Sequence, residues 1–258
     1  MTSGHSGVLV TPIEAIRVDN RSRYLLDRAI ILHCQPYRES SLFVDVFTEH
    51  NGRLRLLCKG ARRGKHPLAE VLRSLNRVRV SFIGRGDLPL LTAAEQADGG
   101  GLALEGTALL CGFYLSELLV RLLPTHDPHP GVFGLCLDTL QQLATGHALQ
   151  QTLRVFEIGL LEEIGYGLRL DEDTEGRAID PDRCYAYYPD QGAVEMNPAT
   201  PGVVQGTTLL ALGERQFSDD TQLREAKCLM RRILHHHLNG RPLKSRELFR
   251  QPDYPDRQ

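Results

Sequence analysis

Long apolar runs are absent from this sequence. No stretch approaches the roughly 20 apolar residues that a membrane-spanning helix needs. The first 20 residues also lack a basic stretch followed by an apolar core, the pattern of a secretion signal. We therefore expect neither membrane insertion nor secretion, and we expect the protein in the cytoplasm.

Closely spaced cysteines are absent too. The six cysteines lie at least 24 residues apart and form no C-x-x-C motif of the kind that binds zinc or does redox chemistry. A chain of 258 residues can bury a core large enough to fold without disulfides. We expect reduced thiols, mostly in the core, at Cys34, Cys58, Cys111, Cys136, Cys184 and Cys228.

Motifs of catalytic chemistry are also missing. The sequence has no H-E-x-x-H, no G-x-S-x-G and no Gly-rich dinucleotide fingerprint. GARRGKH at residues 60–66 has three residues between its glycines where a phosphate-binding loop has four, and a His follows its Lys. His235, His236 and His237 are adjacent on an expected helix, so they point about 100° apart and cannot share one metal ion. We expect no enzyme, no metal and no cofactor.

What the sequence does have is a strong segregation of charge, hidden by a net charge of -2. Residues 21–85 carry 14 basic and 5 acidic side chains, a net charge of +9. Residues 86–223 carry 6 basic and 21 acidic side chains (-15), and residues 224–250 carry 8 and 2 (+6). This pattern indicates that one surface of the protein meets a polyanion and another does not.

The basic first part has the pattern of short strands. Strand-like segments cover residues 25–34, 41–50, 53–61, 75–84 and 88–97, and Asn51-Gly52 is a strong hairpin signal. Five strands over this length predict a small closed barrel of the OB type. If Leu54, Leu56 and Cys58 face the interior, the basic residues that alternate with them, Arg53, Arg55 and Lys59, project outward. By the same alternation, Arg77 and Arg79 project outward from a later strand. Arg62, Arg63 and Lys65 follow in a loop.

Such an Arg-rich surface on an OB barrel predicts nucleic-acid binding, although a solvated basic face is the alternative. Aromatic residues that stack on bases are few in this part, namely Tyr24, Tyr37, Phe43, Phe47 and Phe82. Tyr37, beside Arg38, is the best placed of them, whereas Phe43 and Phe47 fit the core equally well.

The rest of the chain is mostly helical. A Gly-Gly-Gly at residues 99–101 separates it from the strands, and helical patterns cover residues 107–123, 132–144, 148–167 and 219–238. We expect a loose extension at residues 1–20, an OB-fold domain at 21–100 and a helical domain at 101–258. Residues 171–206 are expected to form an irregular segment or a small hairpin within the helical domain. The fold class is therefore α+β.

Four blocks of sequence stand out in order along the chain: YRESSLFVDVFTEHNGRLRLLCKGARR, FYLSELLVRLLP, LRVFEIGLLEEIGYGL and GRPLKSRELFRQ. Together they resemble the RecO family of bacterial DNA repair proteins, over residues 24–251. The resemblance implies an OB-fold on a helical domain that binds single- and double-stranded DNA and anneals complementary strands. It also implies partnership with RecR and with the single-stranded DNA-binding protein SSB, and a functional link to RecF. With these partners, such a protein helps to load RecA on SSB-coated DNA. The resemblance further implies a nucleoid-associated location and a monomer when the protein is free.

The resemblance also implies site residues. The family's basic OB-fold surface corresponds to Arg38, Arg53, Arg55, Lys59, Arg62, Arg63 and Lys65, and its basic C-terminal block to Arg241, Lys244 and Arg246. Some members of the family carry four zinc-binding cysteines after the long helices. Residues 171–206 hold only Cys184, so zinc is not expected here.

The family's recognition of the acidic, Phe-ended tail of SSB requires an apolar slot beside a cation. Arg154 and Arg121 are single bases among apolar helical residues, and we expect Arg154, with Phe156 and Leu160 nearby, to bind the tail. The alternative is that Arg154 reaches water or pairs with Glu157 or Glu117. For the whole protein, the alternative to a DNA-annealing mediator is an adaptor between SSB and RecR with incidental DNA contact.

Overall fold

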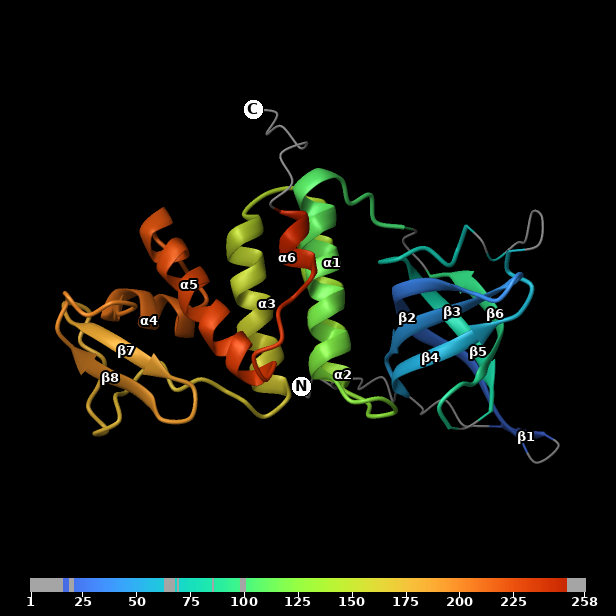
Figure 1. The fold of residues 1–258 in the computed structure, drawn as a ribbon, viewed down its shortest axis with the longest axis horizontal. Helices are drawn as coiled ribbons and strands as arrows, with labels where there is room; N and C mark the ends of the chain where they lie inside the picture. Colours follow the sequence, from blue (N-terminus) through green and yellow to red (C-terminus); the bar gives the residue numbers. More distant parts are fainter. Residues whose placement is uncertain are drawn as a thin grey trace, which may run out of the picture. The chain divides into compact units, whose positions relative to one another are not determined.

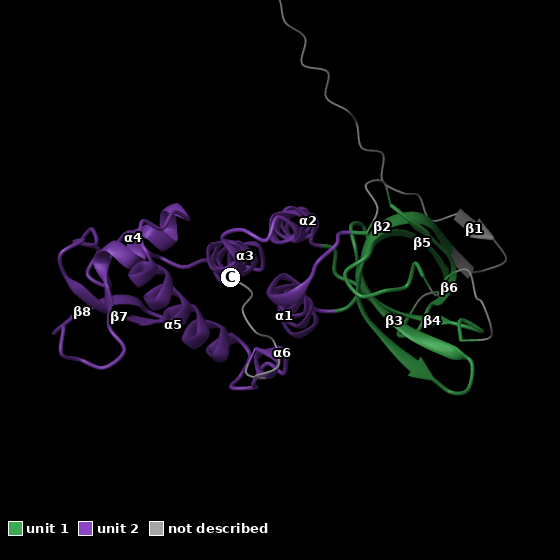
Figure 2. Ribbon diagram, turned by 90° about the horizontal axis from the view of Figure 1, so that it is seen from above, with its two compact units in different colours: residues 1–101, 125–128 green, residues 102–124, 129–258 purple. Residues whose placement is uncertain are grey.

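A computed structural model gives the fold, and it describes residues 16–18, 21–62, 68, 70–84, 86–97 and 101–249. The chain divides into two compact units (Figure 2), one of residues 1–101 and 125–128 and one of residues 102–124 and 129–258. In this division residues 125–128 belong to the first unit, whereas the sequence placed them within the helical domain expected at 101–258. Most of the expected loose extension lies outside the described residues, but Ile16–Val18 forms a strand, β1.

The first unit is a β-barrel (Figure 1), as the strand pattern predicts. Its other strands are β2 (Arg21–Tyr37), β3 (Ser41–Thr48), β4 (Gly52–Cys58), β5 (Arg77–Ile83) and β6 (Leu90–Gln96). The strand order is β1-β2-β3-β4-β6-β5, and pairing of β2 with β5 closes the barrel. The five strands β2 to β6 therefore form the predicted OB-type barrel, and β1 adds to its edge by pairing with β2.

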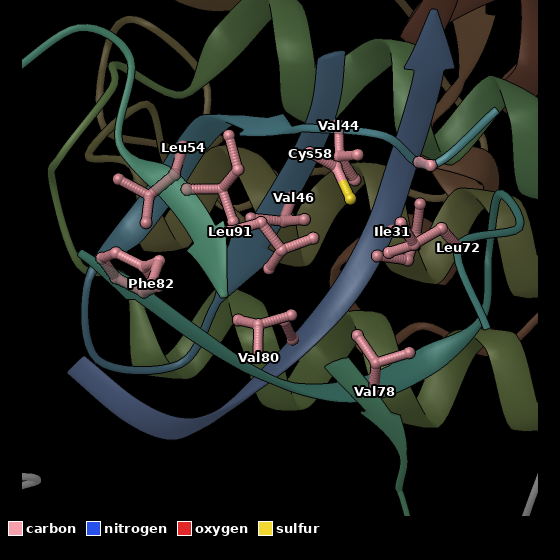
Figure 3. Packing of buried hydrophobic residues seen from close by; sticks show 13 residues of the cluster. Ile31, Val44, Val46, Leu54, Cys58, Leu72, Val78, Val80, Phe82 and Leu91 are labelled. Atoms are coloured by element: carbon pink, nitrogen blue, oxygen red, sulfur yellow. The ribbon is translucent and has the colours of Figure 1, made fainter. Parts of the chain in front are cut away.

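The barrel interior is built from alternating side chains. Along β4, Leu54, Leu56 and Cys58 are buried, and the same period continues in Val78 and Val80 of β5. Figure 3 shows Leu54, Cys58, Val78 and Val80 among the side chains that point toward one another inside the barrel. Because the side-chain period of a strand is two, the residues between them face outward.

The hairpin between β3 and β4 turns at the expected Asn51-Gly52. Thr48 pairs with Gly52, and Gly52 has a φ of +67°, which favours glycine. The backbone amide of Asn51 donates to the side chain of Thr48 over 3.0 Å. The turn therefore fixes the register of the hairpin.

Strand β2 carries an irregularity near its start. Its register with β5 shifts between Tyr24 and Asp27, and Leu26 lies there with a φ of 54°. The amide of Leu26 donates to the hydroxyl of Ser81 over 3.1 Å. As in other β-bulges, the extra residue changes which side chains face inward. Asp27 consequently lies on the same row as the core residues Ala29 and Ile31, with no exposed surface.

The second unit is mainly helical. Its helices are α1 (Gly106–Leu122), α2 (Pro130–Ala144), α3 (Leu149–Glu163), α4 (Gly206–Glu214), α5 (Asp220–His237) and α6 (Ser245–Leu248). The four long helices occupy the segments that the apolar periodicity predicts, and the carboxylate of Asp219 caps α5 as expected for an acidic N-terminus. Helices α4 and α6, which are short, were not predicted from the sequence. None of the described helices is long and apolar enough to cross a membrane.

Residues 171–206 form more structure than a single hairpin. Strands β7 (Cys184–Tyr188), β8 (Gly192–Met196) and β9 (Val204–Gln205) make an antiparallel sheet in the order β8-β7-β9. The loop before it is organised by Asp173, whose carboxylate accepts from the amides of Glu175 and Arg177, both over 2.9 Å, and from the Arg177 side chain over 2.8 Å. These contacts of the Asp173 carboxylate fix the conformation of a loop for which the sequence predicted no regular structure.

Candidate nucleic-acid interface

The outward row of β4 carries the expected basic residues. Arg55 and Lys59 are exposed, and Arg53 is half-buried because residues 125–128 lie against this end of the strand. The amide of His126 donates to the carbonyl of Arg53 over 3.0 Å. The alternation therefore predicts the direction of these side chains correctly, while tertiary contacts decide how much of Arg53 reaches solvent.

Part of the basic charge is balanced by carboxylates. Arg55 makes a two-point contact with Asp45 of β3, with nitrogen–oxygen distances of 2.8 and 3.0 Å. This hydrogen bond raises the pKa of Arg55, whereas burial lowers the pKa of Arg53. On another flank of the barrel, Arg79 lies 3.8 Å from Glu95. The count of 14 basic side chains thus overstates the number of unpaired cations that a ligand would meet.

A group of aromatic and cationic side chains gathers where β2, β3 and β4 lie side by side. The Tyr37 and Phe43 rings are 4.1 Å apart between centroids. The Arg38 guanidinium lies 5.1 Å from the centre of the Tyr37 ring, and that of Arg55 lies 5.8 Å from the centre of the Phe43 ring. With the neighbouring bases, these residues form what we call the cation–aromatic ridge: Tyr37, Arg38, Phe43, Arg55, Lys59 and Arg62.

The ridge has cations available for a ligand. Arg38, Lys59 and Arg62 are exposed, and within the described part of the chain no carboxylate lies within ion-pair distance of them. Arg62 is held by its own contacts to the β2–β3 turn, since its Nη1 donates to the Arg38 carbonyl over 3.2 Å. Cations next to accessible aromatic rings are the arrangement that binds a phosphate chain and its bases together. Arg63 and Lys65, predicted for the same loop, lie outside the described residues.

The other predicted DNA-binding residues belong to other elements than the ridge. Arg77 and Arg79 are on β5, which is separated from β4 by β6. Arg241, Lys244 and Arg246 are in the second unit, where the amide of Lys244 donates to the carboxylate of Glu117 over 3.0 Å. The ridge and the C-terminal block therefore belong to different units.

The second unit contains a small cavity of about 90 Å³ with an unusual concentration of cations. Arg154, Lys227, Arg231 and Arg246 line it together with the apolar surfaces of Tyr114, Leu153 and Phe249; we call it the cationic cavity. Burial, and then the charges of Arg231 and Arg154, lower the pKa of Lys227. Lys227 and Arg231 were not predicted from the sequence, although their spacing of four residues on α5 places them on one helix face.

Arg154 is both paired and part of this cavity. Its Nε and Nη2 donate to Glu157 over 2.7 and 2.6 Å, and the Tyr114 hydroxyl donates to the same carboxylate over 2.6 Å. Burial alone would lower the pKa of Arg154, but the Glu157 carboxylate outweighs it and the pKa is raised. The buried Nη1 of Arg154 and Nη2 of Arg246 have no hydrogen-bond partner among the described residues. These two nitrogens require an acceptor.

The remaining residues predicted for the SSB tail lie elsewhere. Arg121 is exposed on α1, 3.4 Å from Glu117, and is not part of the cavity lining. Phe156 and Leu160 are fully buried core residues of α3 and do not line the cavity either. The expectation that they contact a ligand needs correction, because a side chain with no exposed surface is not accessible to one. The apolar part of the lining comes from Leu153, Tyr114 and Phe249 instead.

Comparison with known proteins decides the family. The model of the N-terminal domain of recombination protein O matches residues 23–99, and the model of its C-terminal domain matches residues 103–247. The chain belongs to the RecO family. A DNA repair protein RecO from Methylococcus capsulatus is 52% identical over 240 residues, which cover 93% of this chain and 98% of that protein.

More distant members of the family match over similar lengths. RecO from Pseudomonas paraeruginosa is 44% identical over 85% of this chain and 92% of its own length, and RecO from Ralstonia nicotianae is 41% identical over 86% and 82%. The resemblance inferred from the four sequence blocks is confirmed, and so is the fold that it implies.

Other features of the described residues fit neither a metal nor a disulfide. No group of three or more potential metal ligands is found among them. His236 pairs with Asp190 over 3.1 Å, while the His237 ring stacks on Tyr166 with centroids 4.4 Å apart, so the adjacent histidines do face different partners. All six cysteines are free thiols, and burial raises the pKa of Cys136 to about 12.

Proposed function

We propose that this protein is a DNA-binding recombination mediator of the RecF pathway, located at the nucleoid. It binds DNA through the basic face of its barrel, anneals complementary strands and, with RecR, helps to load RecA on single-stranded DNA coated by SSB. The observation that carries the DNA-binding step is the cation–aromatic ridge, in which three exposed cations lie beside the Tyr37–Phe43 ring pair.

The ridge has the properties that annealing requires. Exposed guanidinium and ammonium groups bind phosphates without regard to sequence, and a strand held by its phosphates keeps its base edges free to pair. Because the rings present one small patch, they hold only one or two bases at a time. An incoming complementary strand therefore finds most of the bound strand ready for pairing.

The test is charge reversal on the ridge at residues without carboxylate partners. Arg38→Glu with Lys59→Glu is expected to weaken binding of a single-stranded oligonucleotide at least tenfold and to slow annealing of complementary strands. Arg224→Glu with Arg232→Glu is the matched control, because it changes the net charge by the same amount at two exposed residues of α5. Reversal at Arg55 is unsuitable, since it would place a carboxylate against Asp45.

The outcome separates a mediator from an adaptor. A mediator loses DNA binding and annealing together in the ridge variant and keeps both in the control. An adaptor that contacts DNA only incidentally keeps its function with SSB and RecR in both variants. Unchanged annealing in the ridge variant would reject the proposal for this surface.

A second function is favoured by the cationic cavity. We propose that it binds the acidic C-terminal tail of SSB, with the terminal carboxylate accepting hydrogen bonds from Arg154 and Arg246 and the terminal aromatic ring lying against Leu153, Tyr114 and Phe249. The support is the pair of buried guanidinium nitrogens without a partner among the described residues. An anion accepts from both nitrogens and also balances the positive charge of the four basic residues in the lining, which a neutral acceptor does not balance.

The tail proposal is tested by fluorescence anisotropy with a labelled peptide of the SSB tail. Lys227→Ala and Arg231→Ala remove charge from the cavity without touching the buried Arg154–Glu157 pair, and each is expected to weaken binding at least fivefold. Arg121→Ala is the control, because Arg121 lies outside the lining. Annealing of SSB-coated oligonucleotides should also fall when SSB lacks its tail. Equal binding by all three variants would remove the cavity as the tail site.

A further inference from the structure

One mouth of the barrel holds a second cavity, distinct from the ridge. It has a volume of about 270 Å³ and is lined by the aromatic rings of Tyr24 and Phe82, the side chain of Leu54 and the polar residues His50, Asn51 and His126. This volume is close to the lower end of the roughly 300–1,000 Å³ of small-molecule sites, and barrel mouths are a common place for such sites. The cavity therefore suits a ligand fragment of modest size.

The aromatic wall of this mouth cavity comes from two paired strands. Tyr24 of β2 lies opposite Phe82 of β5, and their rings stack with centroids 4.6 Å apart and planes 17° apart. Phe82 is buried in the barrel core, whereas Tyr24 is only partly buried. A flat ligand that lies on the Tyr24 ring extends an existing stack.

The polar wall is held in place by the buried carboxylate of Asp27. Its Oδ1 is 2.9 Å from Nδ1 of His50, and its Oδ2 accepts from the side-chain amide of Asn51 over 2.6 Å. A carboxylate only accepts hydrogen bonds, so it selects the His50 tautomer with hydrogen on Nδ1 and orients the Asn51 amide nitrogen toward itself. What remains for a ligand is an acceptor from each residue, Nε2 of His50 and Oδ1 of Asn51, together with the second hydrogen of the Asn51 amide nitrogen.

The charge of the lining narrows the class of ligand. None of the described residues that line the mouth cavity is Lys, Arg, Asp or Glu, in contrast to the cationic cavity. A phosphate or a carboxylate would find no fixed counter-charge there. A neutral, flat heterocycle with hydrogen-bond donors on its edge complements both the aromatic wall and the two fixed acceptors.

We propose that the mouth cavity binds one unstacked nucleobase, preferably one with an exocyclic amino group that donates to His50 and Asn51. Binding a single splayed base with an aromatic ring on its face and polar groups at its edge is how proteins commonly hold single-stranded nucleic acid. A DNA strand is the expected source of the base, and to that extent the inference rests on the proposed function; a free nucleoside is the other source with the same chemistry.

Free nucleosides test the cavity independently of DNA binding. Deoxyadenosine is titrated into the isotope-labelled full chain while NMR follows the side-chain signals of Asn51, His50 and His126. We expect saturable shifts with deoxyadenosine, no saturable shift with 2-deoxyribose 5-phosphate, and several-fold weaker binding of deoxyinosine, which has a carbonyl where adenine has its amino group. Equal affinity for deoxyinosine would overturn the hydrogen-bond assignment, and no saturable shift with any nucleoside would overturn the site.

Two variants link the signals to the cavity. Tyr24→Leu removes the stacking surface and should weaken deoxyadenosine binding about tenfold, the order expected for one stacked base. His126→Asn alters the lining at an exposed position, and Asn tolerates the left-handed backbone of His126, which has a φ of 62°. It should weaken binding even if Tyr24→Leu does not fold. The control is Tyr188→Leu, which removes an exposed ring of the second unit that lines neither cavity and should leave deoxyadenosine binding unchanged.

A single-stranded oligonucleotide, tested beside the nucleosides, separates this inference from the proposed function. If the protein binds the oligonucleotide but no nucleoside, DNA binding stands and the mouth cavity is rejected. If nucleosides bind but oligonucleotides do not, the cavity stands and the ridge proposal is rejected. If both bind, an intact strand should shift the same Asn51 and His50 signals as deoxyadenosine.

Discussion

The buried pair of Arg154 and Glu157 offers a prediction whose size and pH dependence follow from its geometry. The two side chains are 4% and 1% exposed and meet at 2.6 Å. Replacing Glu157 by Leu leaves a buried guanidinium that cannot give up its proton, and it also leaves the Tyr114 hydroxyl without its acceptor. Breaking a buried pair in this way costs about 3–5 kcal/mol in the free energy of unfolding.

The reverse change should behave differently with pH. In Arg154→Met the unpaired Glu157 carboxylate can take up a proton and become neutral, so its cost falls as the pH is lowered. Each pH unit is worth up to about 1.4 kcal/mol, so the loss seen at neutral pH should shrink by up to about 2–3 kcal/mol at two pH units lower. Glu157→Leu has no such relief, because Arg stays charged over the whole range.

Thermal unfolding followed by circular dichroism of the helices measures both effects. For a unit of this size, each kcal/mol shifts Tm by about 2–4 °C, so Glu157→Leu should lower Tm by about 6–20 °C. The double variant Arg154→Met with Glu157→Leu, combined with Tyr114→Phe, should be more stable than Glu157→Leu alone. Additive losses in the combined variant, or the same pH response in both single variants, would refute the reasoning.

Three further predictions concern other parts of the molecule. Hydrogen bonds from the Ser245 and Lys244 segment, with the charge of Arg121, outweigh burial and lower the pKa of Glu117 from 4.5. A lowered folded-state pKa stabilises the fold above that ordinary value, so wild type should be about 1 kcal/mol more stable than Glu117→Gln at neutral pH, and urea titrations should show this advantage vanishing as the pH falls through the lowered pKa. Gly52→Ala should destabilise the barrel by more than the roughly 1–2 kcal/mol of a left-handed backbone, because its Cβ would overlap the Asp127 backbone, and denaturant unfolding measures the loss. Oligonucleotide affinity should fall with salt with a log–log slope of about -3 to -4, if four to six ridge and neighbouring cations contact phosphates.

Each of these predictions has a direct control. Gly60→Ala has the same left-handed backbone as Gly52 but open space around the added Cβ, so it should show only the backbone cost. Equal losses at the two glycines would contradict the proposed overlap. A pH-independent difference between wild type and Glu117→Gln would show that the charge of Glu117 plays no part. A salt slope near zero would exclude phosphate contacts as the source of affinity.

Local pattern in the sequence was enough to determine the secondary structure that positions the candidate interface. The alternation of Leu54 and Leu56 with Arg53 and Arg55 fixes which side chains leave the barrel, because a strand has a side-chain period of two. Asn51-Gly52 fixes the hairpin, since glycine adopts the left-handed backbone that this turn requires. The four sequence blocks likewise determined the family.

Contacts between distant segments could not be read in the same way. The sequence pointed to Arg154 but not to Lys227 and Arg231 of α5 or to Phe249, which follows α6, although all of them line the same cavity. It also placed Phe156 and Leu160 beside the ligand, although helix packing buries them completely. Periodicity states which face of one element is apolar; it does not state which other element covers that face.

The sequence by itself therefore determined the family, the two kinds of secondary structure and the outward direction of the basic residues, because these depend on local periodicity and turn chemistry. Only the tertiary structure decided which basic side chains of the barrel remain available to bind a phosphate. Asp45 pairs with Arg55 across neighbouring strands, and Arg38 lies against the Tyr37 ring. The same folding brings Asp27 to His50 and Asn51 at the barrel mouth. Charge neutralisation and cavity formation depend on distances between residues far apart in sequence, and only the folded chain sets those distances.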